Sequence, residues 1–83
     1  MTYEAIKSRL DVRPFQPFRV IPSRGEGYEV RHPEMAFPTR TETVIASPDR
    51  QGVPSQARIV ANLHITALEP IETALWRWRG SQN

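Results

Sequence analysis

The sequence contains no cysteine, so neither a disulfide nor a thiolate zinc site is available to stabilise so short a chain. It contains only two histidines, His32 and His64, and a metal would need a carboxylate such as Glu34 beside them. The spacing of these three residues along the sequence gives no reason to expect their side chains at one metal site. We therefore predict no metal and no cofactor.

Long apolar runs are also missing. No window approaches the roughly 20 apolar residues of a membrane span, and the first residues lack the apolar run of a signal peptide. We therefore expect a cytoplasmic protein with no membrane partner. Lysine is scarce as well, since ten of the 11 basic residues are arginine. With a net charge of only +2, this composition permits a nucleic-acid partner without requiring one.

The motifs that mark common enzyme classes are absent. Gly25 and Gly27 flank Glu26 in a turn that no helix follows, so they do not form a phosphate-binding loop. No serine lies in a nucleophile elbow. His32 and Glu34 suggest a base and its orienting carboxylate, but Pro33 interrupts the strand between them. We prefer a structural role for His32, with its side chain hydrogen-bonded at the rim of the fold, and we predict that the protein is not an enzyme.

What the sequence does contain indicates one small domain over residues 1–83, with a helix followed by short strands. Thr2 is a suitable N-cap, and Tyr3, Ile6 and Leu10 have helical spacing, so we expect a helix over residues 2–12. Pro14 and Pro17 hold the next residues extended, and we interpret the segment from Pro14 to Phe18 as the joint between helix and first strand. Phe15 and Phe18 should pin the helix to the sheet.

The remaining segments predict a mostly β fold. Strands are expected at residues 18–21, 28–32, 42–46 and 57–65, with a short fifth strand near residues 66–69 and an exposed loop over residues 47–55. In the fourth strand, Ile59, Ala61, Leu63 and Ile65 alternate along one face, which we expect in the core, while Val60, Asn62 and His64 face a second surface. We infer a small antiparallel five-stranded bent sheet or barrel over residues 15–70, Sm-like in its element order, with a short C-terminal helix or tail over residues 71–83.

Three motifs carry a resemblance to a family of small uncharacterised bacterial proteins: Arg13–Val20, Gly27–Glu34 and Leu63–Pro70. The resemblance covers most of the chain up to Pro70 and implies no activity, substrate or cofactor. The tail beyond Pro70 lies outside the shared pattern.

The candidate binding residues combine arginine, histidine and tryptophan: Arg24, Arg31, His32, His64, Trp76, Arg77, Trp78 and Arg79. Indole rings stack on bases and guanidinium groups pair with phosphates, so the tail can contact nucleic acid. We prefer the alternative in which one tryptophan closes the open end of the barrel, the other packs on the first helix, and the arginines lie in solvent.

We therefore carry two hypotheses. The first is a non-catalytic module that binds a protein partner or copies of itself through open strand edges. The alternative is a barrel that binds RNA or single-stranded nucleic acid through an arginine and tryptophan surface.

Overall fold

The computed structural model of the chain describes residues 1–71. The helix or tail expected over residues 71–83 lies outside the described residues, apart from Ile71. The expected N-terminal helix is present as α1 (Tyr3–Leu10), and the Thr2 hydroxyl caps it by accepting a hydrogen bond from the Ala5 amide at 3.1 Å. The helix ends at Asp11, ahead of Pro14.

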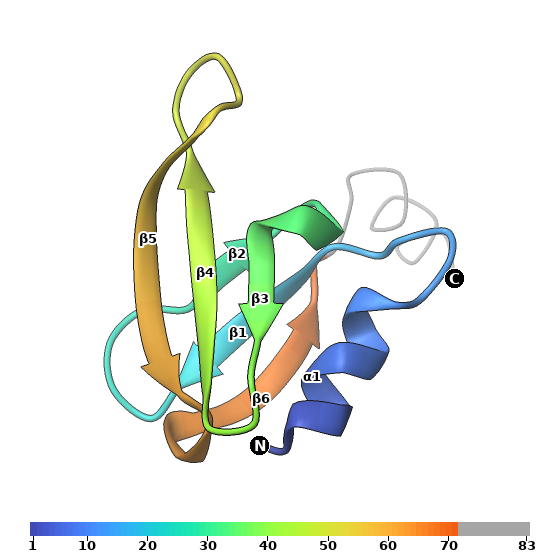
Figure 1. Cartoon of the computed structure of the whole chain (residues 1–83), viewed down its shortest axis with the longest axis vertical. Coiled ribbons are helices and arrows are strands. Elements are labelled where there is room, and N and C mark those ends of the chain that lie inside the picture. Colours follow the sequence, from blue (N-terminus) through green and yellow to red (C-terminus); the bar gives the residue numbers. More distant parts are fainter. Residues whose placement is uncertain (72–83) are drawn as a thin grey trace, which may run out of the picture.

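Six strands follow within the described range, in two antiparallel sheets of three. One sheet has the order β2-β1-β6, formed by β2 (Tyr28–Val30), β1 (Phe18–Pro22) and β6 (Ile65–Pro70). The other has the order β3-β4-β5, formed by β3 (Ala36–Pro38), β4 (Glu42–Pro48) and β5 (Pro54–Ala61). Figure 1 shows β3, β4 and β5 side by side, with β1 and β6 crossing behind them and α1 beside β3.

The number of strands and sheets differs from the prediction. We expected five strands in one bent sheet or barrel, whereas residues 1–71 form six strands in two sheets. The strand expected over residues 28–32 stops at Val30, because Pro33 has no amide to donate to a ladder and instead begins the single-turn 3-10 helix η1 (Pro33–Met35). After that turn the chain continues as β3, which pairs with β4 and not with β1. Residues 36–38 are thus a strand that the sequence did not suggest.

The core lies between the two sheets and under the helix. Phe18, Val20 and Val30 come from one sheet and Ile45 from the other, and each is at most 1 % exposed. Ile6 of α1 is fully buried against them.

The expected joint between the helix and the first strand is present. The Phe15 and Phe18 ring centroids are 6.1 Å apart, and the Arg9 guanidinium of α1 lies 5.7 Å from the Phe18 centroid. Phe18 is completely buried, and Phe15 is half-buried against the core. The Ile71 amide donates to the Pro17 carbonyl at 3.1 Å, so the end of β6 returns to the same joint.

The prediction for the long strand had the wrong face inside. Ile59 is 67 % exposed and Leu63 is 89 % exposed, whereas Val60 and Asn62 are buried. The strand ends at Ala61, and a second single-turn 3-10 helix, η2 (Asn62–His64), resets the alternation so that Ile65 is buried again. Even-numbered residues are therefore buried before and at the start of the turn, and odd-numbered Ile65 is buried after it.

Candidate interaction surfaces

The outer face of the sheet β3-β4-β5 carries three apolar side chains in one line across its strands. Phe37 lies opposite Val44, and Val44 lies opposite Ile59, so all three side chains project from the same face. We call these three residues the apolar row. Phe37, on the edge strand β3, is 68 % exposed, a large fraction for a phenylalanine.

The rest of that face is poor in charge. Register places Ala46 opposite Ala57, and Glu42 opposite Ala61, beside the apolar row. Glu42, at the beginning of β4, is the one charged residue among these paired outer positions. The face therefore presents an apolar surface with a single carboxylate at one end.

The outer face of the other sheet is its chemical opposite. There Arg19 lies between Glu29 on β2 and Glu69 on β6, again in one line across three strands, which we call the charged row. Arg19 Nη2 donates to Glu29 Oε2 at 3.0 Å, and Arg31 Nε donates to the second carboxylate oxygen at 3.1 Å. The hydrogen bonds from Arg19 and then Arg31 lower the pKa of Glu29 below its ordinary value.

The turn η2 is held firmly although two of its side chains are exposed. The Asn62 side chain accepts from the Thr43 hydroxyl at 2.8 Å and donates to the Thr39 carbonyl at 2.9 Å, and both Thr43 and Asn62 are buried. The Ser23 amide donates to the His64 carbonyl at 2.7 Å, which ties the turn to the end of β1. The chain therefore presents Leu63 and His64 from a fixed backbone.

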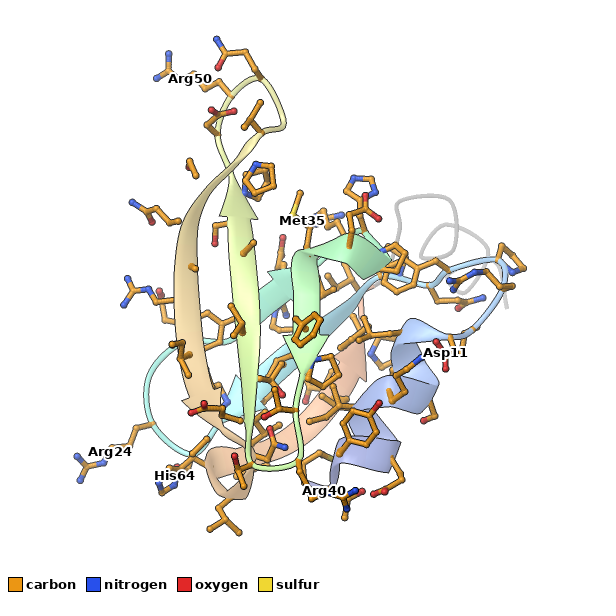
Figure 2. All side chains as sticks on the ribbon, in the orientation of Figure 1. Asp11, Arg24, Met35, Arg40, Arg50 and His64 are labelled. Atoms are coloured by element: carbon orange, nitrogen blue, oxygen red, sulfur yellow. The ribbon has the colours of Figure 1, made fainter. Side chains whose placement is uncertain are left out.

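A shallow hollow lies beside this turn. It has a volume of about 520 Å³ and is bordered by the hairpin loop after β1, the end of β5, and η2. We call it the basic hollow after Arg24 and His64, which line it together with Tyr28 and Ile59. Figure 2 shows Arg24 and His64 at the same end of the molecule.

A second hollow, of about 460 Å³, lies on the helix side of the same turn. It is lined by Met1, Tyr3, Glu4, Arg40 and Leu63, among others. The Met1 ammonium group donates to the Asn62 carbonyl at 3.0 Å, and Met1 forms part of the border of this hollow. With Glu4 and Arg40 both on its border, it shows no preference for one sign of charge.

The candidate binding residues predicted from the sequence separate into three groups. Arg24 and His64 come together at the basic hollow. Arg31 lies at the other end of the β1–β2 ladder and is engaged with Glu29. Trp76, Arg77, Trp78 and Arg79 lie outside the described residues.

Within residues 1–71, His32 makes no side-chain hydrogen bond of the kind predicted for it at the start of η1. It is exposed and N-terminal to η1, where its side chain makes no capping hydrogen bond. Within residues 1–71, no three histidine or acidic side chains are grouped so that they could hold a metal ion.

The apolar row was missed by sequence reasoning, although a signal for it exists. Asn62 is a turn-forming residue in an otherwise apolar segment, and a turn placed there reverses the predicted phase and puts Ile59 outside. Phe37 lies between Pro33 and Pro38 in a segment too short to indicate a strand. Its exposure depends on pairing with β4, which is a tertiary property.

No protein-family model, curated protein or solved structure matches the chain. In residues 1–71 there is no helix of the length and apolar character needed to cross a membrane.

Proposed function

We propose that the protein is a non-catalytic self-association module and that the apolar row is its contact surface with a second copy. The observation that carries this proposal is the line of Phe37, Val44 and Ile59, in which Phe37 and Ile59 are exposed and Val44 between them is half-buried. Exposed apolar surface of this kind marks interaction sites when it is contiguous. We also propose that the order of helix and strands is Sm-like, which goes further than the two three-stranded sheets that the structure describes.

A second copy suits this face because of its charge. The face offers no cluster of basic or acidic side chains that would select a highly charged partner. A two-fold contact requires a self-complementary surface, and a nearly uncharged sheet face meets that requirement.

Glu42 determines how the copies face one another. With a two-fold axis along the apolar row, Phe37, Val44 and Ile59 meet the same residues of the second copy, while Glu42 meets the second copy's Ala46. With an axis along β4, the two Glu42 carboxylates would meet, at a cost in free energy. We therefore favour the axis along the row, with the strands of the two copies antiparallel.

The size of the face limits the strength of the contact. With strands about 4.8 Å apart and a rise of about 3.4 Å per residue, β3, β4 and β5, which have 3, 7 and 8 residues, give a face of roughly 290 Å². Stable interfaces bury about 800 Å² on each partner. The expected dimer is therefore weak and depends on protein concentration.

The experiment compares two lysine substitutions by sedimentation velocity over a wide range of protein concentrations. Ile59→Lys places a charge at one end of the apolar row, inside the proposed contact, and should raise the dimer dissociation constant about tenfold or more, the effect of leaving a buried charge unpaired. Leu63→Lys is the matched control, because Leu63 is even more exposed but lies on η2, away from the row. Circular dichroism should show that both variants remain folded.

Two results would contradict the proposal. One is a wild-type protein that stays monomeric at every concentration. The other is a dimer that Leu63→Lys weakens as strongly as Ile59→Lys, since that would place the contact on the turn and not on the sheet.

A further inference from the structure

The basic hollow differs from the apolar row in having two kinds of lining side chain, which we call its polar wall and its apolar wall. Arg24, Ser23 and His64 supply one guanidinium, one hydroxyl and one imidazole, and Tyr28 and Ile59 supply apolar surface. No acidic residue lines it. A volume of about 520 Å³ lies within the range of about 300–1,000 Å³ that is usual for small-molecule sites.

Arg24 is available to a ligand in a way that two other arginines are not. Arg19 and Arg31 both donate to the Glu29 carboxylate, so each already has an acidic partner. Arg24 forms no ion pair with any residue in the range 1–71, not even with Glu26 in its own loop. Its guanidinium is therefore free to donate two parallel hydrogen bonds to phosphate or carboxylate.

The backbone around the hollow is preorganised. The hydrogen bond of 2.7 Å from the Ser23 amide to the His64 carbonyl joins the two segments that carry Arg24 and His64. The buried Asn62 side chain fixes the same turn from the other side. Holding both walls in place lowers the ordering cost of binding.

We propose that the basic hollow binds a nucleotide, with Arg24 and His64 on the phosphate and with Tyr28 and Ile59 against the base. A planar, weakly polar base with an anionic phosphate matches the two walls, whereas a purely apolar ligand would leave Arg24 unused. The nucleotide can be a free mononucleotide or one unit of single-stranded RNA, because both present the same chemistry. The site does not require the proposed dimer, but Ile59 belongs to both the hollow and the apolar row. Binding is therefore measured at protein concentrations below the dimer dissociation constant.

The experiment follows backbone amide signals of the ¹⁵N-labelled protein while adenosine monophosphate, a single-stranded RNA hexamer, adenosine or inorganic phosphate is added. The first two probes should shift the amides of Ser23, Arg24 and residues 61–64, and the last two should bind more weakly because each meets only one wall. Tighter binding of the monophosphate than of the hexamer identifies a free nucleotide as the ligand, and tighter binding of the hexamer identifies RNA.

Arg24→Gln should weaken binding about tenfold or more, since it removes hydrogen bonds to a charged group. Arg50→Gln is the matched control, because Arg50 is an exposed loop arginine at the opposite end of the molecule (Figure 2). Arg24→Gln should leave the dimer dissociation constant unchanged, which separates this proposal from the previous one. Absence of binding by both nucleotide probes, signals that shift away from the hollow, or equal weakening by both glutamine variants would overturn the proposal.

Discussion

The two sheets of this fold are alike on the inside and opposite on the outside. Each contributes buried aliphatic side chains to one core, yet the outer face of β2-β1-β6 carries the charged row and that of β3-β4-β5 carries the apolar row. The charged row contains its own hydrogen-bonded partners. The apolar row lacks a covering layer in the described structure. Contact with a partner would therefore bury apolar surface on this face but not on the charged one.

This difference teaches that an apolar side chain does not decide by itself which face of a strand is buried. Ile45 on β4 and Ile59 on β5 belong to the same sheet and are 1 % and 67 % exposed. Ile45 faces the other sheet, whereas Ile59 faces solvent. The layer opposite the strand determines burial, and the amino-acid type only permits it.

The largest expected effect comes from comparing these two isoleucines directly. Ile45→Ala should lower the free energy of unfolding by about 2–5 kcal/mol, because it removes buried methyl groups and leaves a cavity. Ile59→Ala should change it by less than about 0.5 kcal/mol in the monomer, since its side chain is already in contact with water.

Urea denaturation at low protein concentration measures both free energies of unfolding. Equal losses for the two variants would show that Ile59 is buried in the monomer. In that case the apolar row would be part of the core, and the contrast between the faces would disappear.

A second prediction concerns the polar pair within the core. Thr43→Val and Asn62→Ala each leave a buried polar atom without its partner, so each should cost about 1–3 kcal/mol. The double variant should cost clearly less than the sum, because replacing both members removes the unmet partner in the pair.

A double-mutant cycle, measured by urea denaturation, tests this coupling. Additive losses would mean that the Thr43–Asn62 hydrogen bond does not hold η2 in place. The fixed presentation of Leu63 and His64 would then need another cause.

Features that depend on a few neighbouring residues were predicted from the sequence, and features that depend on strand pairing were not. The helix, its Thr2 cap and the Phe18 anchor follow from spacing and from proline chemistry over a few residues, and they were predicted. The apolar row was not, because its existence depends on pairing between β3, β4 and β5. The phase of β5 failed at Asn62, where one buried side-chain network converts a continuous apolar run into a strand, a turn and a new strand.

The smallest expected effect comes from the charged row and depends on pH. Because Arg19 and Arg31 lower the pKa of Glu29, the folded state binds that proton more weakly than the unfolded chain does. The contribution to stability is therefore complete above the unfolded pKa and is lost as the pH falls through the lower, folded pKa. Since the Glu29 side chain is 42 % exposed, we expect less than about 1 kcal/mol, as for other surface ion pairs.

Urea midpoints between neutral and acidic pH, compared for the wild type and Glu29→Gln, measure this contribution. The wild type should lose slightly more stability on acidification than Glu29→Gln does. Glu69→Gln is the matched control, because Glu69 lies on the other side of Arg19 and makes no ion pair with it. Glu69→Gln should not reduce the pH dependence as much as Glu29→Gln if the two hydrogen bonds to Glu29 are its cause. An equal reduction would show that long-range attraction between charges stabilises the charged row. The two outer faces would then differ only in their overall charge.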